Sequence, residues 1–493
     1  MEHDGTESRD TLPVSSWEGA FFGAGWQPGG SVLDSTDVVH GHRLTTVGVP
    51  EERQIAEVAA LADRTRRQWW SLPPENRAEV LRRAAELLIT WREELAGWLV
   101  AESGAVWGKA LWELEGSAAE LNEAAELATL DTTVEADSPV PGRRAEARRV
   151  PLGVVGVITP WNMPMLLAVR SVGPALATGN AVLLKPDPNT PVSGGTLLAH
   201  VLRRAGVPDG LFAVLPGDAD TARSVVDAAE VTAVSFTGST SAGREVGRRA
   251  GGGLKKCLLE LGGNNPFVVL DDADPVTAAE AGAWGGFVHS GQLCIGVGRH
   301  LVHRSIAEEY VAALVERAEA LVVGDPRHGG TQIGPIINRT QHERISSIVA
   351  ATVESGARKL TSREPEFPFH PPTVLTGVRP GTPAFDEEIF GPVAAVTVFD
   401  DDAEAVGLAN ASEHGLSAAV RSGSEERGNA VARELRAGMI HLGDQTVNSE
   451  PKLPFGGFGQ SGNGGSFGGV AGVEAFSTWQ TRTVTGPGRK FRF

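Results

Sequence analysis

The sequence predicts an α/β protein built around a parallel sheet, and three observations lead to that fold class. Short apolar runs bounded by glycine and proline recur after residue 150, at Val154–Ile158, Ala181–Leu184, Phe212–Leu215, Ala233–Phe236 and Pro266–Leu270. Amphipathic stretches such as Met165–Thr178 and Ser193–Ala205 lie between them. The composition, 41% apolar and 21% charged, is globular. Such runs indicate strands buried on both faces, and a nucleotide site at the strand ends is then the default expectation.

Composition and charge also exclude several functional classes. A chain of 493 residues can bury a large core, and its 61 glycines and 30 prolines are spread out, unlike those of collagen-like or wholly disordered chains. The net charge of −17 predicts no nucleic-acid or membrane-surface binding. No apolar stretch approaches the roughly 20 residues of a membrane span, and the acidic start lacks a signal-peptide pattern. Only two cysteines occur, which predicts a reducing, cytoplasmic compartment.

The first 104 residues carry no visible chemistry. Residues 1–50 predict an irregular lead-in with a short strand at Arg43–Val47. Residues 51–104 turn helical behind the Pro73-Pro74 start signal. Apolar residues recur there at three- and four-residue steps, which places them on one helix face in the core: Leu81, Ala84, Leu88, Trp91 and Leu95.

A second α/β series follows the first and predicts two lobes with a cleft between them. It runs from Val276 to Ala437, with strands expected at Val393–Phe399 and, just beyond it, at Met439–Leu442. A glycine-dense stretch then spans residues 454–462. Its two phenylalanines favour an ordered loop over a flexible linker.

Cys294 is a candidate nucleophile. A cysteine among small and apolar residues is often a buried hydrophobe, but the flanking Gly291 and Gly296 allow close backbone approach and an N–H aimed at a ligand. A catalytic thiol there would need help to become a thiolate. Cys257, in the strand-like stretch Leu254–Leu261, is predicted to be core.

Glu260 and Asn162 each admit two interpretations. Glu260 follows Leu259 at a buried strand end, where desolvation would raise its pKa and suit it to general-base work; it could instead be satisfied by backbone donors at a turn. Asn162 lies between a strand and a helix. Its side chain could cap that helix or donate to a developing oxyanion.

The stretch from Thr237 to Gly243 runs from a strand into a helix, a place that favours a phosphate. It resembles part of a P-loop, but Arg244 and Glu245 replace the residues that bind phosphate and magnesium, so NTP hydrolysis is not expected. Lys185, at a strand end, could reach a ribose or phosphate or lie in water.

No metal centre is expected. The chain has no C-x-x-C or H-E-x-x-H motif, and His300 and His303 fit structural roles in a strand.

Seven motifs in a fixed order resemble those of the NAD(P)-dependent aldehyde dehydrogenase superfamily. They are Pro160-Trp161-Asn162, Lys185-Pro186, Phe236-Thr237-Gly238-Ser239, Leu259-Glu260-Leu261-Gly262-Gly263, Gly291-Gln292-Leu293-Cys294, Glu387-Glu388-Ile389-Phe390-Gly391-Pro392 and Pro454-Phe455-Gly456-Gly457. Each is weak alone, but seven in order leave little room for chance. The resemblance runs from about Glu51 to the C-terminus.

The resemblance implies an aldehyde dehydrogenase-like α/β fold with three parts. These are a Rossmann-type cofactor domain over residues 1–130 and 150–257, an α/β catalytic domain over residues 258–475, and a small β oligomerisation arm over residues 131–149 and 476–493. Residues 136–149 and the tail after Phe476 match that arm. A homodimer or homotetramer is therefore expected.

The resemblance also assigns the chemistry. Cys294 attacks an aldehyde, the Asn162 amide and the Cys294 N–H hold the oxyanion, hydride leaves for the nicotinamide, and Glu260 activates water to release the acid from a thioester. Glu260 speaks for hydrolysis over transfer to coenzyme A. The implied cofactor residues are Thr159, Pro160, Trp161, Lys185, Pro188, Gly238, Ser239, Leu261, Glu388 and Phe390. Among them Lys185 and Ser239 bind the adenosine ribose and pyrophosphate, Glu388 holds the nicotinamide ribose, and Phe390 packs beside the ring.

One departure from the family pattern concerns the cofactor. Many NAD-preferring members place a glutamate three residues after the lysine, where this chain has Pro188. Asp187 adds negative charge that opposes the extra phosphate of NADP, depending on its orientation. NAD is the predicted cofactor, with NADP as the alternative.

Within the superfamily the motifs look like those of the benzaldehyde dehydrogenase group, whose neighbours act on vanillin and salicylaldehyde. The substrate is therefore predicted to be an aromatic aldehyde, in a mainly apolar tunnel lined by Met163, Leu167, Arg170, Ile295, Ser449 and Phe455. Arg170 is expected near a polar ring substituent. The alternatives are an aliphatic aldehyde or semialdehyde dehydrogenase, a thiol hydrolase that pairs Cys294 with a histidine such as His289, and a catalytically silent relative.

Overall fold

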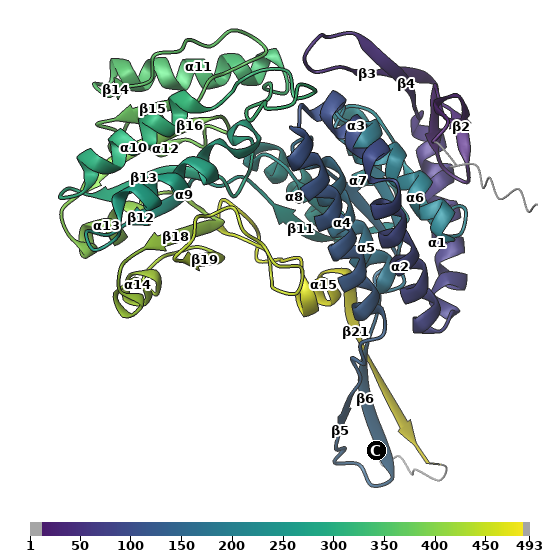
Figure 1. Ribbon diagram of the computed structural model, residues 1–493. Helices are drawn as coiled ribbons and strands as arrows, with labels where there is room; N and C mark the ends of the chain where they lie inside the picture. The colour runs from purple at the N-terminus through teal and green to yellow at the C-terminus, as the bar shows by residue number, and fades with distance from the viewer. Residues whose placement is uncertain (1–11, 487–493) are drawn as a thin grey trace, which may run out of the picture.

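The structure, a computed structural model, describes residues 12–486 and contains two α/β units and a three-stranded arm (Figure 1). The first unit holds a seven-stranded sheet in the order β11-β10-β7-β8-β9-β1-β2. Its strands are β11 (Lys256–Glu260), β10 (Val231–Thr237), β7 (Val154–Ile158), β8 (Ala181–Lys185), β9 (Phe212–Val214), β1 (Ala20–Phe22) and β2 (Trp26–Pro28). The five from β11 to β9 are parallel, and every residue of β7 and β8 is buried. Burial on both faces explains their continuous apolar runs.

Helices pack against this sheet (Figure 1). They are α1 (Glu52–Ser71), α2 (Pro74–Thr90), α3 (Arg92–Ser103), α4 (Trp107–Ala128), α5 (Pro164–Ala177), the π-helical turn η2 (Val192–Thr196), α6 (Leu197–Ala205), α7 (Ala219–Asp227) and α8 (Thr240–Gly252). Both helical stretches predicted between the apolar runs are present. The one after Ser193 begins as the π-helical turn, not as an α-helix.

Two predictions for the first 104 residues need correction. The expected single helix face is shared by α2 and α3, because the chain breaks at Trp91; its other members, such as Leu88 and Leu95, are fully buried as predicted. The lead-in is also more regular than expected, with η1 (Val14–Ser16), β1, β2, and a hairpin of β3 (Ser31–Thr36) and β4 (Arg43–Val49). These strands are three to seven residues long, too short for a clear alternation of apolar residues.

The second unit holds another seven-stranded sheet, in the order β14-β15-β16-β13-β12-β18-β19, which is parallel except for β14. Its strands are β14 (Arg358–Lys359), β15 (Thr373–Thr376), β16 (Val393–Phe399), β13 (Val297–His303), β12 (Asn265–Val269), β18 (Ser417–Arg421) and β19 (Met439–Leu442). Its helices are α9 (Pro275–Phe287), η3 (Val288–Gly291), α10 (Ala307–Ala320), α11 (Arg339–Glu354), α12 (Pro383–Asp386), α13 (Asp402–Ala409) and α14 (Glu425–Ala432). The predicted strands at β16 and β19 have the expected bounds.

The glycine-dense stretch is an ordered loop, as predicted. It contains β20 (Phe458–Gly459), which pairs with β17 (His414–Gly415), and Gly462 forms a β-bridge with Glu260. Helix α15 (Gly469–Phe476) follows and packs on α4 and α5. The loop thereby joins the end of β11 to the second unit.

The arm is an antiparallel sheet of β21 (Ser477–Thr485), β6 (Arg143–Pro151) and β5 (Val134–Ala136). Strand β21 pairs with β6 over nine residues, from Ser477 opposite Pro151 to Thr485 opposite Arg143. The arm projects away from both units (Figure 1). Residues 1–11 and 487–493 of the predicted domains lie outside the described residues, and the domain boundaries stay a prediction.

Among the helices of residues 12–486, none is long and apolar enough to cross a bilayer.

Candidate active site

The predicted site residues gather at the carboxyl ends of four adjacent parallel strands. Lys185 ends β8 beside Ile158 of β7, and Glu260 ends β11 beside Thr237 of β10. Thr159 follows β7 and is buried. Because parallel strands end at one edge of a sheet, this edge is where a ligand binds in open α/β folds.

Glu260 is a buried carboxyl with no polar partner. It is 2% exposed, and neither carboxyl oxygen has a hydrogen-bond partner among the described residues. Burial raises its pKa well above the usual value, and the Arg170 guanidinium opposes this. The alternative of an acid satisfied by backbone donors at a turn is therefore wrong, because no donor in the described part of the chain bonds to this carboxyl. A raised pKa suits a group that takes a proton from water near neutrality.

Two glycines after Glu260 bring this strand end against its neighbours. A Cβ on Gly262 would lie 2.2 Å from Glu388 Oε2, and one on Gly263 would lie 2.5 Å from the carbonyl oxygen of Cys294. Real Cβ atoms essentially never lie within 3.0 Å of such non-bonded atoms. Gly263 is thus required where the end of β11 meets the backbone of the cysteine loop, while Gly262 leaves room for the Glu388 carboxyl.

The loop that carries Cys294 has an unusual backbone. His289 and Ser290 both adopt positive φ, 51° and 55°, and Gly291 follows at 66°. Left-handed conformations cost energy in residues with a Cβ and cluster at functional sites. The Gln292 side chain holds the loop, since its Oε1 accepts from the Ile337 N–H at 3.0 Å and its Nε2 donates to Pro335 O at 3.3 Å.

The thiol of Cys294 lies within reach of several charged groups. Burial, helped by the carboxyls of Glu388 and Glu260 and opposed by Arg170, raises its pKa to about 12. The residue keeps partial exposure, and both cysteines are free. Cys257 packs on the core as predicted, and burial raises its pKa to about 11. Burial therefore raises the pKa of both Cys294 and Glu260, and both shifts favour the uncharged form of the group.

Asn162 directs its side chain at the cysteine loop. The residue is buried, and Nδ2 donates to Gln292 O at 3.0 Å, two residues before Cys294. The N-cap position of α5 is held by Met163, and the side chain of Asn162 donates to Gln292 O, so the N-cap alternative for Asn162 is wrong. An amide N–H held beside a nucleophile is the geometry of an oxyanion donor.

The residues predicted to contact the cofactor fit a dinucleotide. Glu388 Oε1 accepts from the Gly263 N–H at 2.8 Å, and burial raises the pKa of Glu388 to about 7. Phe390 has φ 54° and meets the Trp161 ring edge-to-face at 5.4 Å. Ser239 is the N-cap of α8. Lys185 is buried, and burial lowers its pKa while Asp187 and Asp218 oppose this.

Thr159 supplies a further sign that a polar ligand binds at this edge. Its buried hydroxyl has no hydrogen-bond partner within residues 12–486. A buried polar atom without a partner is uncommon. Together with the charge of Lys185 and the open N-terminus of α8, it fits a phosphate- and ribose-bearing group.

The six predicted tunnel residues form two groups. Met163, Leu167 and Ile295 belong to one apolar cluster, together with Leu166, Leu293, Val447 and Val288. Arg170 joins the other three-residue group, because its guanidinium lies 4.5 Å from the ring of Phe455 and donates to Ser449 Oγ at 3.2 Å. A cavity of about 770 Å³ beside them is lined by Trp112, Trp284, Val447 and Ser449 among others.

Sequence reasoning missed the charged residues of α4. Glu120 accepts from Arg170 Nε at 2.9 Å, and Lys109 and Glu113 form a buried ion pair next to Asn162. The signal that could have found them is a lysine and a glutamate four residues apart on a helix whose neighbouring positions are apolar.

The His289 alternative gains no support. Burial and the nearby Lys109 lower the pKa of His289 well below its usual value, and Nε2 has no hydrogen-bond partner among the described residues. A general base needs to reach the proton it takes. His300 binds the Tyr310 hydroxyl at 2.7 Å, which fits the structural role predicted for it.

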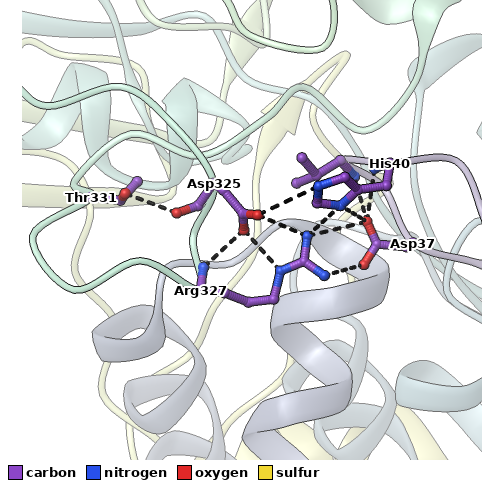
Figure 2. A network of polar contacts seen from close by, with 6 residues as sticks. Asp37, His40, Asp325, Arg327 and Thr331 are labelled. Carbon is purple, nitrogen blue, oxygen red and sulfur yellow. Dashed lines mark hydrogen bonds and ion pairs between the residues drawn. The ribbon is translucent and has the colours of Figure 1, made fainter.

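One group of residues has potential metal ligands close together. Ligand atoms of Asp37, His40 and His42 lie within 4.8 Å of one another. Figure 2 shows that the Arg327 guanidinium already engages this group: it donates to Asp37 at 2.8 Å, to His40 Nδ1 at 2.6 Å and to Asp325 at 2.9 Å. A cation directed at these atoms repels a metal ion. The network instead ties the β3–β4 connection to the loop after α10.

Comparison with known proteins follows the same lines. The aldehyde dehydrogenase family model matches residues 26–482. The chain is 44% identical over 473 residues to benzaldehyde dehydrogenase (NAD(+)) of Pseudomonas putida, which covers 96% of this chain and 97% of that protein. It is 45% identical over 479 residues to vanillin dehydrogenase of an Amycolatopsis species, with 97% and 98% covered. A solved salicylaldehyde dehydrogenase of Pseudomonas putida G7, complexed with salicylaldehyde, matches with a TM-score of 0.93 at 29% identity and covers 96% of this chain and 99% of its own. These matches confirm the resemblance and the fold class inferred from the seven motifs.

Proposed function

Because the chain belongs to the aldehyde dehydrogenase family and is an NAD(P)-dependent enzyme of that family, we propose that it oxidises an aromatic aldehyde of the benzaldehyde type to the carboxylic acid. The observation that carries the proposal is the meeting of four groups around one thiol. Burial and the charges of Glu388, Arg170 and Glu260 all act on Cys294, and Asn162 is bonded to the same loop.

The aromatic substrate class rests on two kinds of support. The relatives named for benzaldehyde and vanillin are 44% and 45% identical to this chain over nearly its full length. The predicted tunnel residues Met163, Leu167 and Ile295 share an apolar cluster that suits a flat ring. Beside it, the Arg170 guanidinium offers a donor to a hydroxyl or methoxyl on that ring.

In the proposed reaction Cys294 releases its proton to solvent, and the thiolate attacks the aldehyde carbon to form the alkoxide of a thiohemiacetal. The Asn162 amide and the Cys294 N–H donate to the oxygen, on which negative charge develops. When bound, the nicotinamide supplies the hydride acceptor. Loss of the hydride leaves a thioester on Cys294.

Hydrolysis of the thioester is assigned to Glu260. Its carboxyl has no hydrogen-bond partner within residues 12–486, so a water molecule can bind it without displacing one. As a carboxylate it takes a proton from that water, the hydroxyl oxygen attacks the thioester carbon, and the Cys294 thiolate leaves. The Cys294 thiolate then takes up the proton held by Glu260, so the products are the carboxylic acid, the restored thiol and the Glu260 carboxylate.

The cofactor is proposed to be NAD, with NADP as the alternative. Lys185 and Ser239 would hold the adenosine half, and Glu388 and Phe390 the nicotinamide half. Asp187 lies close enough to Lys185 to affect its pKa, and its Oδ1 accepts from the Asn189 N–H at 2.9 Å. A carboxylate there disfavours a 2′-phosphate by like-charge repulsion.

The arm is proposed to serve self-association into a homodimer or homotetramer. It exposes Val134, Trp479 and Val484, and β19, at the edge of the second sheet, exposes Ile440 and Leu442. Exposed apolar side chains on an edge strand favour pairing with another chain. The two free cysteines fit a cytoplasmic location, which is part of the proposal.

The direct test follows nicotinamide reduction with purified protein, NAD or NADP, and a panel of aromatic and aliphatic aldehydes, with Cys294→Ala as the control. Fast reduction with benzaldehyde-type substrates that disappears in the variant supports the proposal. Turnover only with aliphatic aldehydes or semialdehydes would keep the chemistry and overturn the substrate class. Ester cleavage without any reduction would favour a thiol hydrolase.

A further inference from the structure

A buried ion pair lies on α4 beside Asn162, outside the residues assigned to the reaction. Lys109 and Glu113 are one helical turn apart, and their side chains are 1% and 0% exposed. Lys109 Nζ donates to Glu113 Oε2 at 2.5 Å. Burying two charges costs several kcal/mol per ion, and apolar residues of similar size are often as stable or more so. The pair is therefore poorly explained as a device for stability.

The remaining atoms of the pair contact the backbone on both sides of the Asn162-Met163 junction. Lys109 Nζ also donates to the carbonyl oxygen of Asn162 at 2.9 Å. Glu113 Oε1 accepts from the Met165 N–H at 2.8 Å and from the Leu166 N–H at 3.3 Å.

Those N–H groups belong to the first turn of α5, which needs such an acceptor. The N-cap, Met163, provides no side-chain hydrogen bond to the turn, and Pro164 has no N–H. Glu113 therefore supplies the cap from another helix, and its negative charge suits the positive end of the α5 dipole.

The pair thus fixes the backbone of Asn162 from α4, while the side chain of Asn162 reaches Gln292 in the cysteine loop at 3.0 Å. We propose that Lys109 and Glu113 are positioning residues that hold the Asn162 amide where the oxyanion forms. This inference rests on the proposed function, in which Asn162 is the oxyanion donor.

Position matters steeply for such a donor. Oxyanion-hole donors act at about 2.7–3.1 Å, and loss of one costs about 10²–10³ in kcat. With Lys109→Met the Asn162 carbonyl loses its lysine partner and the peptide can rotate. We expect kcat/KM for the aldehyde to fall about tenfold to a hundredfold, with the KM for NAD and the rate of Cys294 alkylation by iodoacetamide unchanged.

A second variant guards against a folding failure, because Lys109→Met leaves the Glu113 carboxylate unpaired. The double variant Lys109→Met/Glu113→Gln removes both charges and keeps a side-chain oxygen for the α5 N–H groups. It should show the same loss of kcat/KM. Rates are divided by the concentration of alkylatable Cys294, so a smaller folded fraction does not count as lost catalysis.

Arg77 provides a matched control. It is a buried cation that donates to two backbone carbonyls, Ala177 O at 3.1 Å and Leu72 O at 2.9 Å. Ala177 ends the same helix α5, about 20 Å from its start. Arg77→Met should lower the melting temperature and leave kcat/KM per active site within about twofold of the wild type.

A double-mutant cycle with Asn162→Ala identifies the route of the effect. If Lys109 acts through the amide, Lys109→Met costs less than about threefold once the amide is absent. Two results would overturn the inference. One is an equal loss from Lys109→Met in the wild type and in Asn162→Ala; the other is a wild-type kcat/KM for folded Lys109→Met and for the double variant. The proposed function still stands in either case if Asn162→Ala is impaired. Full activity of Asn162→Ala would overturn both the inference and the assignment of Asn162, and activity in Cys294→Ala would overturn the proposed function itself.

Discussion

Cofactor affinity is expected to depend on pH through Glu388. Burial raises the pKa of this carboxyl to about 7, although the Gly263 N–H and Arg344 oppose the shift. The ionised form makes hydrogen bonds to ribose hydroxyls roughly twice as strong as the neutral form does. If NAD binds the ionised form, part of the free protein must lose a proton before it can bind.

The size of the effect follows from that pKa. The apparent Kd is the intrinsic Kd divided by the ionised fraction, so it is multiplied by about 11 at pH 6 and by about 1.1 at pH 8. NAD should therefore bind about tenfold more weakly at pH 6 than at pH 8. Quenching of tryptophan fluorescence in NAD titrations at fixed ionic strength measures this, with Trp161 beside the expected ring position as one reporter.

The matched variant is Glu388→Gln, which keeps the shape and removes the titration. Its Kd should be raised at pH 8 and change less than about twofold between pH 6 and pH 8. A flat wild-type profile, or an equal slope in both proteins, would refute the assignment of the titration to Glu388.

The same raised pKa predicts that the unfolding free energy falls as the pH rises, whereas the affinity for NAD increases. Because the folded state binds the proton more tightly than the unfolded state, unfolding releases a proton between about pH 4.5 and pH 7. Glu388 should then cost about 3 kcal/mol of unfolding free energy as the pH rises through that window, at about 1.4 kcal/mol per pKa unit. Denaturant titrations of wild type and Glu388→Gln without NAD compare the two slopes.

Three further outcomes are expected. Glu260→Gln should lower steady-state turnover at least about a hundredfold yet keep a burst of reduced cofactor equal to the enzyme concentration in stopped flow. A variant that shows neither turnover nor the burst would contradict a role limited to hydrolysis. Arg170→Leu should lower the ratio of kcat/KM on hydroxylated over plain benzaldehydes, and an unchanged ratio would reject the substrate role. Because Glu120 loses its partner at 2.9 Å, the variant should also lose about 3–5 kcal/mol of unfolding free energy in denaturant titration. Arg327→Met should lower the unfolding free energy by about 1–3 kcal/mol, because buried Asp37 loses its guanidinium partner, and should leave kcat unchanged. An unchanged melting temperature would refute a stabilising role for this network.

The strands and the motif residues could be predicted because their signals are local. A strand buried on both faces is mostly apolar and is visible as a run, so β7 and β16, which has Thr397 as its one polar residue, have the predicted bounds. A glycine pair after a carboxylate marks a close approach of backbone to another group, and the structure identifies that group as Glu388 for Gly262. The local sequence predicts that another group approaches the backbone at these glycines, but it does not identify that group.

The short strands of the lead-in could not be predicted in this way. Strand β1 has three residues and β2 has three. They exist because β9 offers an open edge: Phe22 pairs with Val214, 192 residues later. A three-residue segment has too little pattern of its own, and its partner lies outside any local window.

The charges that tune the site were also beyond local reading. Arg170 could be placed in the tunnel from its motif, but Glu120 is 50 residues earlier on another helix. Without Glu120, Arg170 would be an unpaired cation beside the substrate. With Glu120 bound, the pair carries little net charge, so the effect of Arg170 on Cys294 and Glu260 depends on the orientation of its guanidinium. A sequence motif therefore names the reacting groups, while the pKa values of Cys294 and Glu260 depend on burial and on the charge of Arg170, an α5 residue that Glu120 of α4 holds by a hydrogen bond. For this reason substitutions on α4, far from the motifs in sequence, are the sharper test of how this site works.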